Sequence, residues 1–176
     1  LIHVLDLQMG DIIERLAETD LPYIEFGDNL DGMMTNPNLF REYCIPQYQK
    51  YTDMLHQQGK KAGSHTDGNL QPLVDLLPES GLDVCESFTP QPLTELLFED
   101  AWEKWCNGPL IWGGIPSDLL EERTEQAVFE AFVDKLLATV GCNPIIVGVG
   151  DMVLDNNRIE RVKYIADRIE AHDLGT

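Results

Sequence analysis

Basic residues are scarce in this chain, which carries 12 Lys and Arg against 31 Asp and Glu in 176 residues, for a formal net charge of −19. A surface of this charge repels nucleic-acid phosphates and anionic lipid headgroups. No apolar run approaches the ~20 residues that cross a bilayer. No basic segment followed by an apolar one opens the sequence, so nothing predicts export. We therefore expect a cytoplasmic protein that binds neither nucleic acids nor membranes.

Cysteine pairs with the spacing of metal knuckles or redox motifs are also missing. The four cysteines are widely separated, and no C-x-x-C pair occurs among Cys44, Cys85, Cys106 and Cys142. We interpret them as reduced thiols. The pair Gly113-Gly114 lacks the rest of a phosphate-loop or dinucleotide fingerprint, so it indicates a close backbone approach and not a nucleotide site.

The chain does contain a repeated unit in which a short run rich in β-formers is followed by a helical stretch. The runs cover residues 22–28, 61–65, 82–86, 110–114 and 144–150. Apolar residues with helical spacing occupy 39–55, 70–77 and 127–137, and we expect further helices over 6–19 and 155–172. Strands that alternate with helices of this length predict an α/β fold built from parallel βα repeats, here a single domain over residues 1–176.

Polar residues follow most of these predicted strands. In parallel βα folds the functional side chains gather where strands lead into the following loops. The resulting candidates are Asp28, Asn29, His65, Asp67, Glu86, Asp118 and Asp151. His65 and Asp67 are two apart on an extended segment, so their side chains point the same way and can converge on one ligand.

An imidazole joined by carboxylates from Asp67, Glu86 or Asp151 suits zinc or a harder divalent ion. The alternatives are structural. His65 can instead hydrogen-bond Asp67 or a backbone group and fix the loop that follows. Asp28 and Asn29 can cap the loop 30–35, and Asp151 can cap the last helix.

Five separated segments carry a resemblance to a known family. They are Gly27-Asp28-Asn29, residues 36–42 with Pro46 and Tyr48, the segment 60–69 (KKAGSHTDGN), the segment 81–86 (GLDVCE) and Gly113-Gly114-Ile115. This pattern resembles the second half of the uroporphyrinogen decarboxylase superfamily, over about Tyr23 to Ala171. That superfamily includes the decarboxylase itself and zinc-dependent methyltransferases that move methyl groups between corrinoid proteins and thiols such as coenzyme M.

The resemblance implies the C-terminal part of a (β/α)8 TIM-type barrel, with the N-terminal half absent. In the methyltransferase branch the second of these strands ends His-x-Cys, and a further Cys near the last strand completes a zinc site. His65 matches, Asp67 stands where the cysteine would be, and Val149 replaces the last-strand Cys, or the His of the decarboxylase. The thiolate zinc site of the family is therefore not reproduced.

The resemblance favours a methyltransferase that acts in corrinoid-linked methyl transfer or demethylation. We expect His65 and Asp67 as metal ligands or as an acid–base pair, assisted by Glu86, which is also a candidate ligand, with Asp28, Asn29 and Asp151 binding a small-molecule substrate. Zinc or another divalent ion is the expected cofactor, and a methylated corrinoid on a corrinoid protein is the expected partner.

Two other functions stay open. One is a decarboxylase-like lyase acting on a porphyrinogen, which is less favoured because the carboxylates of such a substrate require basic residues and the predicted strand ends are acidic. The other is a non-catalytic binding module or an inactive remnant, for which Val149 is the main support.

Five strands of an eight-stranded barrel leave two exposed sheet edges, which invite pairing with another chain. The chain also begins at Leu1 without a methionine. We therefore expect either a segment of an enzyme of about twice this length or a homodimer in which two copies cover each other's open sides.

Overall fold

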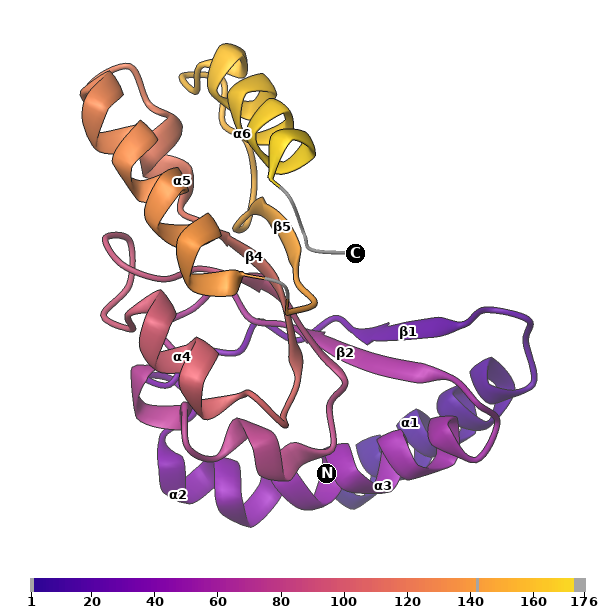
Figure 1. Cartoon of the computed structure of the whole chain (residues 1–176). Coiled ribbons are helices and arrows are strands. Elements are labelled where there is room, and N and C mark those ends of the chain that lie inside the picture. Colours follow the sequence, from indigo (N-terminus) through magenta and orange to yellow (C-terminus); the bar gives the residue numbers. More distant parts are fainter. Residues whose placement is uncertain (1, 142, 173–176) are drawn as a thin grey trace.

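The computed structural model describes residues 2–141 and 143–172 (Figure 1). Its parallel strands form a sheet in the order in which they follow one another along the chain: β1 (Tyr23–Phe26), β2 (Lys61–His65), β3 (Val84–Phe88), β4 (Leu110–Ile115) and β5 (Ile146–Val149). Sequential parallel strands joined by crossovers are the arrangement of a TIM-type barrel. The predicted α/β class, with βα repeats of a partial barrel, is confirmed.

The helices are α1 (Ile2–Ala17), α2 (Pro37–Leu39), α3 (Ile45–His56), α4 (Phe98–Lys104), α5 (Gln126–Val140) and α6 (Ile159–Ala171). A π-helical turn, Phe40–Cys44, links α2 to α3, and 3-10 turns cover Gln71–Leu73, Leu77–Ser80 and Ser117–Leu120. Of the described helices, none is both long enough and apolar enough to cross a membrane. Cys44, Cys85 and Cys106 are free thiols, as predicted, while Cys142 lies outside the described residues.

The helix predicted over residues 70–77 is wrong. This segment forms two 3-10 turns instead, and each has a proline in its first turn, Pro72 in one and Pro78 in the other. Proline has no backbone N–H and its ring clashes with the preceding helical turn, so an α-helix that starts near Pro72 cannot continue through Pro78. Pro78 therefore lies at the start of a separate 3-10 turn. The last helix also starts later than predicted, at Ile159.

The sheet has one buried face and one face that is only partly covered. Ile24, Ala62 and Cys85 are buried, whereas the residues that alternate with them along the strands are partly or fully exposed, apart from the buried Gly63. We call the exposed and partly exposed residues the open face; it comprises Tyr23, Glu25, Lys61, His65, Val84, Glu86, Leu110 and Trp112. Figure 1 shows α1 and α3 along one side of β1 and β2, with no described helix on their other side.

The open face is concave. Tyr23 on β1 contacts Trp112 on β4, with ring centroids 6.3 Å apart, although two strands lie between them. In a flat sheet the backbones of these strands would be about 14 Å apart, so the contact indicates a sheet that curls as part of a barrel does. Gly63 permits this arrangement, because a Cβ at that position would lie 2.1 Å from the Tyr23 hydroxyl oxygen.

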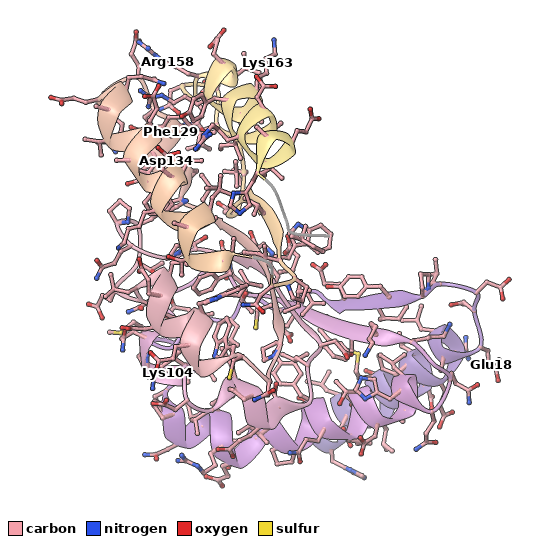
Figure 2. All side chains as sticks on the ribbon, in the orientation of Figure 1. Glu18, Lys104, Phe129, Asp134, Arg158 and Lys163 are labelled. Atoms are coloured by element: carbon pink, nitrogen blue, oxygen red, sulfur yellow. The ribbon has the colours of Figure 1, made fainter. Side chains whose placement is uncertain are left out.

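The helices pack as pairs on the outside of this curve. α3 is bound to α1 through Tyr51, whose hydroxyl donates to the backbone oxygen and to Oδ1 of Asp6 at 3.0 and 2.7 Å. α5 and α6 pack through Phe129 and Tyr164, with ring centroids 5.5 Å apart (Figure 2, where Phe129 is labelled). The loops at the carboxyl ends of the strands therefore remain available for a functional site.

Candidate functional site

His65 lies between two carboxylates at the carboxyl end of the sheet. It ends β2 directly opposite Glu86 of β3, and its Nδ1 is 2.6 Å from Glu86 Oε2. Its other ring nitrogen, Nε2, is 3.6 Å from Asp67 Oδ2. The His65 and Asp67 side chains are 27% and 18% exposed, so both are largely shielded from water yet reachable. The imidazole and the Asp67 carboxylate thus emerge side by side, as the two-residue spacing predicts.

The environment of His65 raises the pKa of its imidazole. Partial burial on its own lowers that pKa, but the hydrogen bond with Glu86 and the negative charges of Asp67, Glu86 and Glu25 outweigh it. The fold therefore favours a protonated imidazole, or an equivalent positive charge, at this position.

Two groups of side chains around His65 have the geometry of metal ligands. Ligand atoms of Glu25, His65 and Glu86 lie within 4.8 Å of one another, and so do those of His65, Asp67 and Asp151. In the second group Asp67 Oδ1 is buried and has no hydrogen-bond partner. A buried carboxylate oxygen without a donor is uncommon, because burial without a partner costs free energy. The second group therefore holds an atom that a cation would satisfy.

The other predicted residues stand apart from these groups. Asp28 accepts a hydrogen bond of 2.6 Å from the hydroxyl of Tyr48, which is also 3.3 Å from Ser64 Oγ. Asn29 is exposed. Asp118 lies on the 3-10 turn after β4, where burial raises the pKa of its carboxyl group. The structure thus brings together His65, Asp67, Glu86 and Asp151, and the substrate-binding roles of Asp28 and Asn29 stay predictions.

Glu25 was not identified from the sequence. It lies in the middle of β1, in register with Gly63 of β2, and it shares the open face with His65. The signal was present in the alternation along β1, where Ile24 and Phe26 are the apolar neighbours of Glu25. Glu25 lies within β1 and not at its end, so the pattern of polar residues after strands does not include it.

The carboxylates of the site have little positive charge near them. Within residues 2–141 and 143–172, every Lys or Arg that forms an ion pair does so with a carboxylate outside the set Glu25, Asp28, Asp67, Glu86 and Asp151. Among the described residues, the His65 imidazole is the one basic group within ion-pair distance of members of the set. Such an arrangement attracts a cation and repels an anionic substrate.

A shallow cavity of about 470 Å³ adjoins Asp67. Its walls include the carboxylates of Asp31, Asp67 and Glu95 and the apolar side chains of Pro92 and Leu93. Asp31 is fixed there by three backbone N–H donors, which overcome the effect of burial and lower the pKa of its carboxyl group. This cavity can admit a small molecule beside the His65–Asp67 pair.

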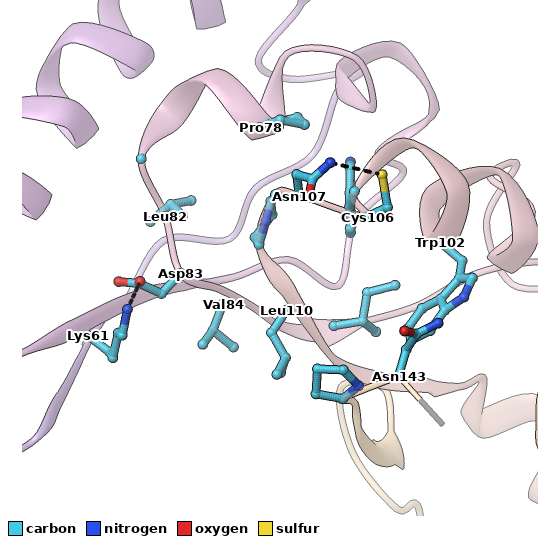
Figure 3. A pocket seen from close by; sticks show the side chains of 16 residues that line it. Lys61, Pro78, Leu82, Asp83, Val84, Trp102, Cys106, Asn107, Leu110 and Asn143 are labelled. Atoms are coloured by element: carbon cyan, nitrogen blue, oxygen red, sulfur yellow. Dashed lines mark hydrogen bonds and ion pairs between the residues drawn. The ribbon is translucent and has the colours of Figure 1, made fainter. Parts of the chain in front are cut away.

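A larger cavity, of about 650 Å³, lies at the opposite end of the strands (Figure 3). Val84, Leu110 and Trp102 contribute to its walls, and the ion pair between Lys61 and Asp83 lies at its edge, with Nζ and Oδ1 2.7 Å apart. None of the predicted site residues lines it. In parallel βα folds this end of the sheet usually serves stability, so we place the chemistry at the other end.

Comparisons with known proteins support the fold. No protein-family model matches the chain, and no curated protein sequence is significantly similar to it. Among solved structures, a methyltransferase from Methanosarcina mazei superposes with a TM-score of 0.64 at 14% sequence identity, covering 90% of this chain and 44% of that one. The chain therefore shares the fold of part of that protein and spans less than half of its length.

Proposed function

We propose that this chain is part of a methyltransferase related to the uroporphyrinogen decarboxylase superfamily, acting in corrinoid-linked methyl transfer or demethylation. The observation that carries the proposal is the arrangement of His65. Its Nδ1 is hydrogen-bonded to Glu86, and its Nε2 faces Asp67. Both contacts lie at the carboxyl end of the sheet, in a chain whose fold resembles part of a methyltransferase.

The donor atoms suit a divalent metal ion. A metal-binding histidine commonly gives its second ring N–H to a carboxylate, which fixes the ring and the tautomer. Glu86 fills that role for Nδ1, leaving Nε2 as the ligand atom beside Asp67. Ligands 2.0–2.1 Å from a tetrahedral zinc ion are about 3.3 Å from each other. The observed 3.6 Å between Nε2 and Oδ2 is close to that separation.

The same residues serve methyl transfer in a defined way. A thiol or hydroxyl acceptor must lose its proton before it attacks a methyl group. A divalent ion stabilises that conjugate base, as it lowers the pKa of bound water from about 15.7 to near 7 in favourable sites. The His65 imidazole and the Asp67 carboxylate are the groups placed to hold the ion, or to take the proton if the pair acts as acid and base.

The charge of the site argues against a decarboxylase. A porphyrinogen carries several carboxylates, whose recognition calls for Arg or Lys. The carboxylates around His65 have no such partner in the described chain. A methyl donor carried by a corrinoid protein, with a neutral or cationic small molecule as the other reactant, is compatible with this surface.

Metal analysis tests the first part of the proposal. The chain is purified without chelator and its zinc, iron, manganese and cobalt are quantified. We expect stoichiometric metal that is lost in His65→Ala and in Asp67→Ala. His56→Ala is the matched control, because His56 pairs with Asp83 through Nε2 at 2.7 Å, away from the site. Metal that is sub-stoichiometric, or that neither site variant changes, contradicts the metal site.

Methyl transfer is tested directly with methylcobalamin and a series of thiols. Loss of the methyl group changes the visible spectrum of the corrinoid, so the reaction is followed by absorbance. We expect turnover that depends on His65 and Asp67. A chain that binds metal but leaves the corrinoid spectrum unchanged with every acceptor supports the non-catalytic alternative, for which Val149 at the end of β5 is the sequence argument.

We further propose that the open face is covered in the functional protein, either by additional βα units or by a second copy of the chain. The strands β1 and β5 are the two edges of the described sheet, and unpaired edges favour association. Size-exclusion chromatography with light scattering distinguishes the two arrangements. A dimer supports the second copy, whereas a well-behaved monomer at dilute concentration rejects it.

A further inference from the structure

Ser87 and Asp151 adopt a backbone conformation that their residue types seldom take. Their φ angles are 61° and 59°, and they are the two non-glycine residues with positive φ in the part of the chain that the structure describes. Ser87 is 2% exposed and lies at an irregularity of β3, where the pairing with β4 shifts between Cys85 and Phe88. Left-handed residues and strand irregularities concentrate next to functional sites, where they redirect side chains.

These two residues are bound to each other. The backbone N–H of Asp151 donates a hydrogen bond to Ser87 Oγ, which joins the turn after β5 to the end of β3. Gly150 lets the two segments approach, because a Cβ there would lie 2.1 Å from Thr89 Oγ1 and 3.2 Å from the Ser87 carbonyl oxygen. Thr89 Oγ1 in turn donates to that carbonyl oxygen at 2.9 Å. The conformation of the turn is thus fixed from the β3 side.

The position of the Asp151 carboxylate follows from this turn. Asp151 brings a carboxylate oxygen within 4.8 Å of ligand atoms of His65 and Asp67, although the residue is exposed. Among the described hydrogen bonds, its contact with Ser87 is made by the backbone and none is made by its side chain. The direction of the side chain therefore depends on the backbone of Asp151, which is bonded to Ser87.

We propose that Ser87 is a positioning residue whose hydroxyl fixes the backbone of Asp151 and thereby directs its carboxylate to the divalent ion assigned to His65 and Asp67. This inference rests on the proposed metal site and adds Asp151 as its third protein ligand. Asp151 then supplies the metal ligand that the apolar side chain of Val149, two residues earlier, cannot supply.

Calorimetric titration of the chelator-treated full chain with Co²⁺ tests the inference, with the visible spectrum of bound Co²⁺ as a second readout. We expect Ser87→Ala and Asp151→Asn each to weaken Co²⁺ binding about tenfold or more and to change the spectrum alike. The double variant should bind no more weakly than Asp151→Asn alone, because positioning has no effect once the carboxylate is gone.

Ser80→Ala is the matched control. Ser80 is also buried, and its hydroxyl donates to the carbonyl of Leu77 and accepts from the N–H of Leu82; it precedes β3, whereas Ser87 lies towards the carboxyl end of that strand. Its Co²⁺ affinity should equal that of the wild type. If Ser87→Ala does not fold, Ser87→Gly replaces it, because glycine adopts positive φ readily and also lacks the hydroxyl.

The outcomes separate this inference from the metal site itself. A wild-type chain that binds no Co²⁺ overturns both. A wild type that binds Co²⁺ with an affinity unchanged in Ser87→Ala or Ser87→Gly overturns the role of Ser87 alone. The role of Ser87 is also overturned if Ser87→Ala weakens Co²⁺ binding as much in the Asp151→Asn variant as it does in the wild type.

Discussion

The guanidinium of Arg161 on α6 lies over the ring of Phe129 on α5, with its central carbon 5.1 Å from the ring centroid. Arg161 is 2% exposed, and it donates to the carbonyl oxygens of Leu119, Glu121 and Thr124 at 2.6–2.7 Å. A buried cation thus holds the loop after β4 and joins it to the two last helices.

Arg161→Met should destabilise the protein by about 3 kcal/mol, because it leaves one buried and two partly buried carbonyl oxygens without donors. Chemical unfolding followed by circular dichroism measures the effect. Arg168→Met is the control on the same helix. Arg168 forms an ion pair with Asp134 in which the side chains are 40% and 54% exposed, so its loss should cost less than about 1 kcal/mol. Equal losses in the two variants would contradict the role assigned to Arg161.

Much of the fold was predictable from the sequence. Each predicted β run contains or overlaps one of the observed strands, because strands with a buried face are rich in β-formers and because Gly27, Pro116 and Gly150 directly follow β1, β4 and β5. Asn36 caps the start of α2 through contacts within its own segment, because its Oδ1 accepts from the N–H groups of Asn38 and Leu39. The segment 70–77 was not predictable from periodicity alone, because Leu70, Leu73 and Leu77 have helical spacing even in 3-10 turns.

The candidate site was predictable in part. The period of two placed His65 beside Asp67, and parallel pairing brought Glu86 to the same level. Asp151 was also a candidate from its place after the last strand, but the left-handed turn through which it reaches them, bonded to Ser87, is revealed by neither spacing nor composition. Arg161 presented the same difficulty, since an arginine on an amphipathic helix is usually exposed and nothing local indicates that it will be buried.

Gly113→Ala should destabilise the protein by about 3 kcal/mol or more. Gly113 has φ 138°, and a Cβ there would lie 2.5 and 2.7 Å from the backbone oxygen and nitrogen of Phe88, which cannot move aside as a flexible side chain would. Thermal unfolding measures the change. Gly10→Ala is the opposite case, because a Cβ within α1 meets nothing within 4 Å and should stabilise the helix by about 0.5–1 kcal/mol. A neutral Gly113→Ala would contradict the packing at the β3 irregularity.

Tyr48→Phe should destabilise the protein by about 1–2 kcal/mol. The Tyr48 hydroxyl is mostly buried, and burial together with the neighbouring Asp28 raises the phenol pKa, so the group stays a neutral donor to Asp28. Tyr43→Phe, at a side chain that is 49% exposed, should have no measurable effect on urea unfolding. If Asp28 binds substrate as predicted, Tyr48→Phe also raises KM. An unchanged KM with lowered stability would assign Asp28 to structure alone.

Glu86→Gln should lower the pKa of His65 in the metal-free protein. Burial lowers the pKa of His65, whereas the hydrogen bond with Glu86 and the Glu86 charge contribute to raising it above its ordinary value. A raised pKa stabilises the fold below about pH 6.5, and that contribution is lost as the pH rises through the folded value. Glu86→Gln should therefore destabilise the protein most at acidic pH and least above neutrality.

An NMR titration of the His65 ring protons gives the pKa, and urea unfolding gives the pH dependence. Glu103→Gln, an equal charge change at an exposed position on α4, should leave both unchanged. A His65 pKa that is the same in both variants would show that Glu86 does not govern the imidazole.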